Sequence, residues 1–146
     1  MNVSTRIHVG VSPLSWTNDV LEDLGGYIPL ETCLAEAAEA GYEGIELGRK
    51  FPRTIDTLAP VLNQAKLKLA SGWYNGLLAK RSFEDELAAV HDHAMLLKSL
   101  GAKVMVYGEC GAIPGLTPLD EPLSKSPPLG HIELPQYAEK VNNLAV

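Results

Sequence analysis

The sequence predicts a parallel α/β fold, because strand-like segments alternate with helix-like segments along its 146 residues. Glycines and prolines stand at many of the changeovers between the two kinds of segment. Hydrophobic residues make up 46% of the chain, which is enough for a packed core, and the length is that of one domain. We therefore expect residues 1–146 to belong to a single α/β domain.

Four segments are predicted to be strands, at residues 7–14, 44–47, 67–74 and 102–107. The second of them is the most informative. Side chains alternate between the two faces of a strand, so Ile45 and Leu47 share the face that helices cover, and Glu46 takes the other face. A carboxylate in that position is either solvated at the strand end or used by a ligand.

Four segments are predicted to be helices, at residues 29–40, 54–65, 82–100 and 135–146. Pro29 opens the first helix, and Gly41 suits the position just past its end. Pro60 should kink or interrupt the second helix. Ser82 begins a sequence that resembles a capping box. The apolar stripes expected to face the core are Leu30, Cys33, Leu34 and Ala37 on the first helix, and Leu87, Val90, Ala94 and Leu97 on the third.

Four βα units in sequence are expected to form part of a barrel wall. A closed (β/α)8 barrel needs roughly 200 residues or more, typically about 250, so this chain supplies about half of one. Half a barrel exposes two strand edges and an inner face. Three interpretations stay open: a truncated product, a chain that pairs with a second copy, and a small open four-stranded sheet. A long proline-rich loop, residues 108–134, precedes the last helix, and loops of this length are usually functional or mobile.

The composition argues against several functional classes. The formal net charge of −6 disfavours a nucleic-acid-binding protein. No apolar run approaches the roughly 20 residues of a membrane span, and the first residues do not resemble a secretion signal. We therefore expect a soluble, cytoplasmic protein. Cys33 and Cys110 lie far apart in unrelated settings, so neither a disulfide framework nor a cysteine-built zinc site is expected.

Polar and aromatic residues gather at the predicted carboxyl ends of the strands, where parallel α/β proteins bind their ligands. These residues are Trp16, Asn18, Glu46, Trp73, Asn75 and Glu109. Tryptophan rings pack on apolar C–H faces, while carboxylates and amides hydrogen-bond to hydroxyl groups. The set therefore predicts a substrate-binding wall for a sugar or a cyclitol. Glu46 and Glu109 are also candidates for a catalytic acid and base.

The histidines do not predict a metal site. His91 and His93 are two residues apart on the predicted third helix, hence about 200° apart around its axis, and cannot bind one metal ion together. We expect both at surface or helix-end positions. The sequence also lacks a glycine-rich phosphate loop, a nucleophile elbow and a zinc motif.

Several segments in combination carry a more specific indication. They are PLSWTND at residues 13–19, PLETCL at 29–34, GYEGIELG at 41–48 with KFP at 50–52, SGWY at 71–74, YGE at 107–109 and PLS at 122–124. Together these segments resemble the N-terminal half of the inosose dehydratase family. The segment at residues 41–47 alone would indicate only the wider xylose-isomerase-like superfamily of TIM barrels.

The resemblance implies a (β/α)8 barrel that dehydrates 2-keto-myo-inositol (scyllo-inosose) to a trihydroxycyclohexanedione in inositol catabolism. It also implies a divalent metal cofactor, manganese or cobalt. The reaction would abstract a proton next to the carbonyl group and expel a β-hydroxyl group, with the metal stabilising the enolate oxygen. The metal ligands of the superfamily come from later strands, so none is assigned in this chain, and we do not expect the chain alone to be active.

Two alternatives to this function stay open. A ketose epimerase or isomerase on the same barrel would share Glu46 and the metal. A non-catalytic truncated half-barrel, or a self-associating module, would have no turnover. The expected partner is a small polyol or cyclitol. Neither nucleic acid nor a membrane is expected as a partner, and a homo-oligomer would cover the open barrel edges.

Overall fold

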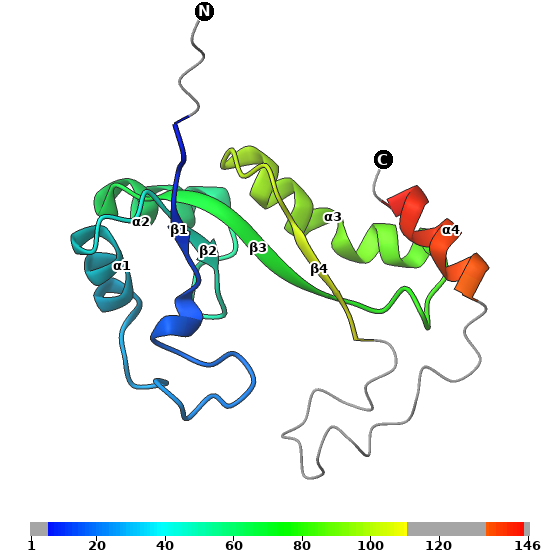
Figure 1. Cartoon of the computed structure of the whole chain (residues 1–146), viewed down its shortest axis with the longest axis horizontal. Helices are drawn as coiled ribbons and strands as arrows, with labels where there is room; N and C mark the ends of the chain where they lie inside the picture. The colour runs from blue at the N-terminus through cyan, green and yellow to red at the C-terminus, as the bar shows by residue number, and fades with distance from the viewer. Residues whose placement is uncertain (1–5, 111–133, 145–146) are drawn as a thin grey trace, which may run out of the picture. The chain divides into compact units, whose positions relative to one another are not determined.

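The computed structural model describes residues 6–110 and 134–144. Figure 1 shows the elements β1 (Gly10–Val11), η1 (Pro13–Ser15), α1 (Leu30–Glu39), β2 (Gly44–Leu47), α2 (Ile55–Ala65), β3 (Lys68–Gly76), α3 (Phe83–Ser99), β4 (Val106–Glu109) and α4 (Leu134–Leu144). Most of the predicted loop, residues 111–133, lies outside the described residues. None of the described helices is long and apolar enough to cross a membrane.

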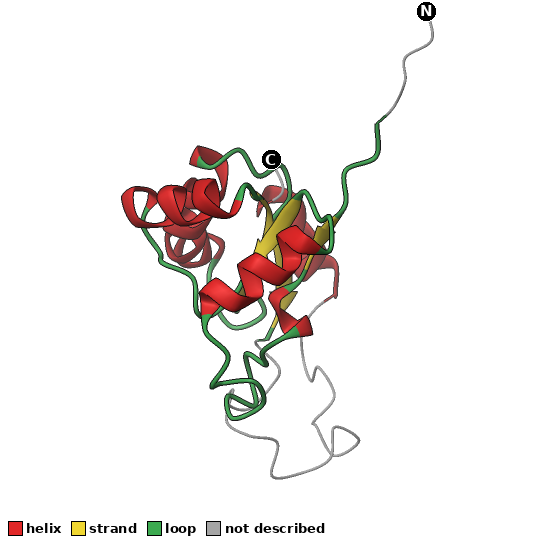
Figure 2. Ribbon diagram, turned by 90° about the vertical axis from the view of Figure 1, so that its left-hand side faces the viewer, coloured by secondary structure: helices red, strands yellow, loops and turns green. Residues whose placement is uncertain are grey.

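The chain divides into two compact units. The first unit contains the residues up to Gly72 together with 96–105, and the second contains 73–95 and the residues from Val106 onward. Helices and strands alternate along both units (Figure 2). The expectation of one domain over residues 1–146 stays a prediction.

The strands are parallel and hydrogen-bond in their order along the chain, β1-β2-β3-β4. In the first unit, Gly10 pairs with Gly44, and the first half of β3 pairs with β2. In the second unit, Trp73 at the start of the remaining half of β3 pairs with Val106. Parallel strands in sequential order, each followed by a helix, are the units from which a (β/α)8 barrel is built. The predicted fold class, about four βα units of such a barrel, is confirmed.

The core of the first unit lies between the strands and the helices. Ile45 and Leu47 are 0% and 3% exposed, and they pack with Leu34 of α1 and Leu58 of α2. Leu96 at the end of α3 completes this core. Alternation along β2 therefore places its aliphatic residues under the helices, as predicted, and leaves Glu46 on the opposite face.

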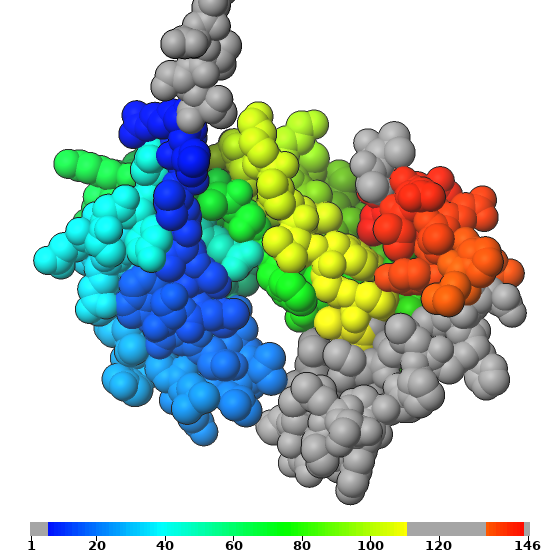
Figure 3. Space-filling model, viewed as in Figure 1, coloured from blue at the N-terminus to red at the C-terminus, as the bar shows by residue number. Residues whose placement is uncertain are grey.

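The first strand is much shorter than predicted. Only Gly10 and Val11 form a ladder, and Pro13–Ser15 form a turn of 3-10 helix. The Ser12 hydroxyl accepts a hydrogen bond from Leu14 N, and Pro13 has no amide hydrogen for a ladder. Before the ladder, Ile7 is 80% exposed. Figure 3 shows this amino-terminal stretch, in dark blue, running uncovered over the visible face of the first unit.

The fourth strand begins later than predicted, at residue 106 instead of 102. Its ladder with β3 starts only at the Trp73–Val106 pair, so the segment before it has no strand partner among the described residues. Where a strand begins depends on the backbone of the neighbouring strand, which supplies the hydrogen-bond partners of the ladder.

The first two helices match the predictions apart from the effect of Pro60. Pro29 stands at the N-cap position of α1 without a side-chain capping hydrogen bond, and Gly41 just beyond the helix has a φ of 87°, a left-handed conformation that favours glycine. Helix α2 runs through Pro60 without interruption, so an interruption at this position is excluded, whereas the alternative expectation of a kink stays a prediction. Pro60 and Asp56 are both exposed, which lets water hydrate the Asp56 carbonyl that loses its helical donor.

Helix α3 begins as predicted, but its buried stripe differs. The Ser82 hydroxyl accepts from Asp85 N at 3.1 Å and donates to the Asp85 carboxylate at 2.8 Å. Leu87, predicted in the core, is 46% exposed, whereas Glu86 is 0% exposed. His93, expected near the surface, is half-buried with its ring 5.5 Å from that of Tyr74, whereas His91 is exposed. The last predicted helix is confirmed as α4.

Candidate functional site

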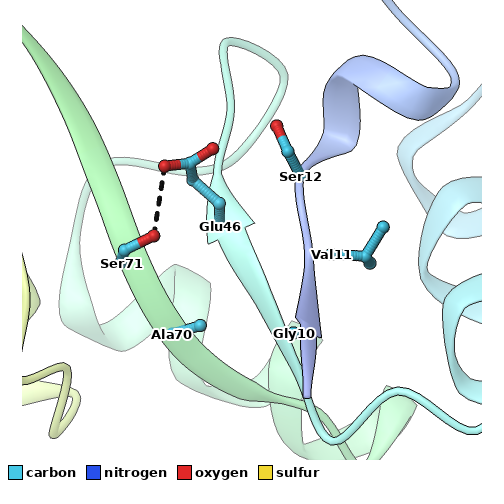
Figure 4. A pocket seen from close by; sticks show the side chains of 6 residues that line it. All are labelled: Gly10, Val11, Ser12, Glu46, Ala70 and Ser71. Atoms are coloured by element: carbon cyan, nitrogen blue, oxygen red, sulfur yellow. Dashed lines mark hydrogen bonds between the residues drawn. The ribbon is translucent and has the colours of Figure 1, made fainter.

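A pocket lies in the first unit near the carboxyl ends of its strands. Its volume is about 200 Å³, and it is lined by Gly10, Val11, Ser12, Glu46, Ala70 and Ser71 (Figure 4). Parallel α/β proteins bind ligands at this end of the sheet. The pocket is therefore the candidate site, and Glu46 is the predicted residue that lines it.

Small residues leave room for the pocket. A Cβ atom added at Gly10 would come within 3.2 Å of the Ala70 Cβ, and one added at Gly44 would come equally close to that atom. Both distances are tighter than ordinary van der Waals contact. The backbones of β1 and β2 thus approach Ala70 on β3 so closely that larger side chains would push the strands apart or fill the space.

The Glu46 carboxylate is held from one side. Ser71 Oγ donates to Glu46 Oε1 at 3.1 Å, and Glu46 is half-buried. In Figure 4 the second carboxylate oxygen points away from Ser71, toward the side where Ser12 lies. The pocket thus presents one carboxylate and two serine hydroxyls, and none of the lining residues is cationic. Such a set recognises hydroxyl groups, because a carboxylate accepts a hydrogen bond and a serine hydroxyl can both donate and accept.

Trp16 and Asn18 do not line this pocket. Trp16 Nε1 donates to Glu36 Oε2 at 2.5 Å, and the Trp16 ring packs partly against the core of the first unit. Asn18 Oδ1 accepts from the amides of Val20 and Leu21 at 2.8 and 2.6 Å. Both polar groups therefore stabilise the segment between β1 and α1 in this structure. Their predicted role in substrate binding stays a prediction.

Trp73 and Asn75 lie in the second unit, on neighbouring positions of one face of β3. Trp73 is 51% exposed, and its Nε1 donates to Asn75 Oδ1 at 2.7 Å. The indole ring lies so close over Gly108 that a Cβ atom there would come within 2.1 Å of it. Cys110 Sγ also contacts Asn75 Oδ1, at 3.6 Å. An exposed indole beside an amide remains suited to a polyol, as the sequence predicts.

Glu109 is bound to other parts of the second unit. Its Oε2 accepts from Ala79 N and from the Tyr137 hydroxyl, both at 3.1 Å. Burial, followed by the charge and hydrogen bond of Glu109, raises the pKa of Tyr137 to about 12. Glu109 thus connects β4 to α4 and to the loop after β3. The suggestion that it acts as a catalytic acid or base stays untested.

Three polar side chains with a role in the structure were not predicted from the sequence. Ser12 and Ser71, which line the pocket, were hidden because isolated serines are common in loops and at strand ends. The third is Glu86, whose Oε1 accepts from Leu77 N at 3.0 Å and from the Tyr107 hydroxyl at 2.8 Å. The exposure of Leu87 shows that the neighbouring Glu86 lies on the buried face of the helix, but the exposure of a side chain cannot be seen in a sequence.

The described residues do not fit the metal that the resemblance implies. Among residues 6–110 and 134–144, no group of three or more His, Cys, Asp or Glu side chains could hold a metal ion. A catalytic centre of this kind needs about three protein ligands. We therefore assign no step to a metal.

Comparison with known proteins identifies relatives of the chain. The rhizopine catabolism protein MocC of Rhizobium meliloti is 42% identical over 99% of this chain and 44% of its own length. An inosose dehydratase of Mesomycoplasma hyopneumoniae is 41% identical over 71% of this chain and 34% of its own length. Inosose dehydratase 2 of Bacillus cereus is 38% identical over 84% of this chain and 41% of its own length. No protein-family model matches the chain.

The chain spans less than half the length of these relatives. Identities near 40% over at least 104 residues show common descent, and the resemblance inferred from the sequence is confirmed. The fold agrees with it, because the four parallel βα units are those of a partial (β/α)8 barrel. The chain is therefore homologous to inosose dehydratases and to MocC, and it corresponds to the N-terminal part of these proteins.

Proposed function

We propose that this chain forms part of the substrate-binding wall of an inosose dehydratase, and that the complete polypeptide removes water from 2-keto-myo-inositol. The observation that carries the proposal is the pocket around Glu46, in a chain related to proteins named inosose dehydratase. Its lining offers hydroxyl-binding groups and no cation. A neutral polyol suits this chemistry better than a phosphorylated one, which would require Lys, Arg or a backbone anion site.

The proposed reaction breaks one C–H bond and one C–O bond. A base removes the proton from the carbon next to the carbonyl group, and the electron pair of the broken C–H bond forms the new C=C bond. The β-hydroxyl group gains a proton and leaves as water. Such an elimination requires that the ring be held in one orientation. We assign this holding role to Glu46, which accepts a hydrogen bond from a ring hydroxyl. The proton transfers are assigned to no residue of this chain.

Replacing Glu46 by glutamine tests the proposal. The glutamine oxygen can still accept from Ser71, but its NH2 group donates where the carboxylate accepted. Losing a hydrogen bond to a charged group should lower the affinity for 2-keto-myo-inositol about tenfold to a hundredfold. The matched control is Glu39→Gln, at the exposed end of α1, which should leave the affinity for 2-keto-myo-inositol unchanged.

The measurements are calorimetric titration with 2-keto-myo-inositol and product formation followed by NMR, in the complete polypeptide with manganese or cobalt added. Equal affinity and rate in wild type and Glu46→Gln would contradict the role of Glu46. No binding and no turnover of 2-keto-myo-inositol by the wild type would contradict the proposed function itself.

A second candidate function comes from MocC, which matches 99% of the chain, whereas the inosose dehydratases of Mesomycoplasma hyopneumoniae and Bacillus cereus match 71% and 84%. On this alternative the protein acts in rhizopine catabolism. Comparing kcat/KM for 2-keto-myo-inositol with that for a rhizopine in one preparation separates the two. A value at least tenfold higher for the rhizopine would favour the MocC-like function.

A further inference from the structure

We propose that Ser71 is a positioning residue, brought to the pocket by a β-bulge, which fixes Glu46 in the orientation that receives the ligand. The expected effect of Ser71 on ligand affinity rests on the proposed function. Its effect on the orientation of the Glu46 side chain does not depend on the identity of the ligand. The proposal assigns to Ser71 a role that the sequence pattern alone did not indicate.

The bulge lies between β2 and β3. Gly44 and Ile45 pair with Lys68 and Leu69, but the next pair is Glu46 with Ser71, so Ala70 is an extra residue on β3. In a regular ladder Glu46 would pair with Ala70, and Ser71 would point to the opposite face, toward the core. The extra residue instead brings both Ala70 and Ser71 to the pocket lining. Bulges of this kind redirect side chains and occur often beside active sites.

The redirected hydroxyl contacts one oxygen of the carboxylate. Ser71 Oγ lies 3.1 Å from Glu46 Oε1, and Figure 4 shows the two side chains pointing toward each other across the strands. It is the sole hydrogen-bond donor to Glu46 that the structure shows within the described residues. Glu46 Oε2 is then left for a ligand, beside the Ser12 hydroxyl on the other wall of the pocket.

Fixing Glu46 before the ligand arrives should strengthen binding. A glutamate side chain has three rotatable bonds, and ordering it upon binding would reduce the affinity. A donor on Oε1 removes part of that cost and also sets which carboxylate oxygen faces the pocket. A serine that acted only on stability would change neither the Glu46 rotamer nor the affinity.

The structural part is tested without ligand. Side-chain scalar couplings of Glu46, measured by NMR in the full chain with 13C-labelled glutamate, should report one dominant rotamer in the wild type and in Ser71→Thr. Ser71→Ala should show averaging over several rotamers. The same dominant rotamer in Ser71→Ala, at an unchanged melting temperature, would overturn the positioning role.

The consequence for binding is tested by a double-mutant cycle with 2-keto-myo-inositol as the probe. Ser71→Ala should weaken binding about three- to tenfold, and Ser71→Thr should stay within about twofold of the wild type. In the Glu46→Ala background, Ser71→Ala should change affinity less than about 1.5-fold, because nothing remains to be positioned. Ser99→Ala, an exposed serine at the end of α3, is the matched control.

The two failures are distinguishable. Equal affinity of Ser71→Ala and wild type, or an undiminished effect of Ser71→Ala in the Glu46→Ala background, overturns the inference and leaves the proposed function intact. A wild type that does not bind 2-keto-myo-inositol overturns the proposed function, and the ligand-free rotamer measurement still decides whether Ser71 positions Glu46.

Discussion

Replacing Glu86 by alanine should destabilise the second unit more than removing any exposed carboxylate of the same helix. Glu86 is 0% exposed in the first turn of α3. Its Oε1 accepts from Leu77 N at 3.0 Å and from the Tyr107 hydroxyl at 2.8 Å, and its Oε2 contacts Arg81 at 3.1 Å. Alanine leaves all three donors without this acceptor.

The magnitude follows from those contacts. A hydrogen bond to a charged group contributes roughly 1.5 kcal/mol at the lower end of its range, and two such bonds come from half-buried donors, Leu77 N and the Tyr107 hydroxyl. The Arg81 side chain is 38% exposed, so water hydrates it when its partner is lost. The free energy of unfolding should therefore fall by about 3 kcal/mol in Glu86→Ala. Glu86→Gln keeps an oxygen for both half-buried donors and should lose only about 1 kcal/mol.

Equilibrium unfolding in urea measures these changes, with Glu84→Ala as the matched control. Glu84 is exposed in the same first turn, so both variants lose the same favourable interaction with the helix N-terminus, roughly 0.5 kcal/mol. A second readout is the alkaline titration of Tyr107, whose pKa is raised by burial and then by Glu86. Equal losses in Glu86→Ala and Glu84→Ala, or an unchanged Tyr107 titration, would refute the reasoning.

Three further predictions concern the loops and the pH dependence. Lys50 Nζ donates to the carbonyl groups of Gly25, Gly26 and Ile28, so Lys50→Met should speed protease cleavage within residues 18–28 about tenfold; an unchanged rate would contradict this. Ser82→Ala removes the N-cap of α3 and should cost about 1 kcal/mol in urea unfolding, whereas Ser82→Asp should restore most of it. The pKa of Tyr137 is raised to about 12 in the folded state, against about 10 in the unfolded chain, so its stabilising contribution is complete below pH 10 and is lost as the pH rises toward 12. Tyr137→Phe should therefore show a smaller loss of stability between pH 10 and 12, and an identical pH profile would count against the raised pKa that burial and Glu109 give to Tyr137.

Much of the fold could be predicted from local patterns. Alternation in Gly44-Ile45-Glu46-Leu47 correctly predicts the strand, its buried residues and the opposite placement of Glu46. Pro29 correctly predicts where α1 begins, because the fixed φ of proline suits the start of a helix. Ser82 correctly predicts where α3 begins, because its hydroxyl caps a nearby backbone amide. Local sequence left open whether Pro60 interrupts α2 or only kinks it, because the cost of an internal proline depends on whether water reaches the freed carbonyl group.

The candidate site could be predicted only in part. The sequence indicated Glu46, since a carboxylate between two aliphatic residues of a short strand needs an explanation. Ser12 and Ser71 could not be found in this way, because each becomes informative only beside Glu46. The predicted wall residue Asn18 caps its own loop, and Glu109 accepts from Ala79 and Tyr137, since nearby donors compete with a ligand for their oxygens.

Local patterns and residue identities along the chain are sufficient to predict the succession of parallel βα units, the buried face of β2 and the relation to inosose dehydratases. These depend on interactions within a few residues, or on identities along the chain. The β2–β3 register, the bulge at Ala70 and therefore the contact between Ser71 and Glu46 become visible only in the folded chain. The same holds for the burial of Glu86 and the exposure of Leu87 on α3. In both cases the partner of a side chain depends on packing between segments that are distant in sequence, and at Ala70 one extra residue changes that partner.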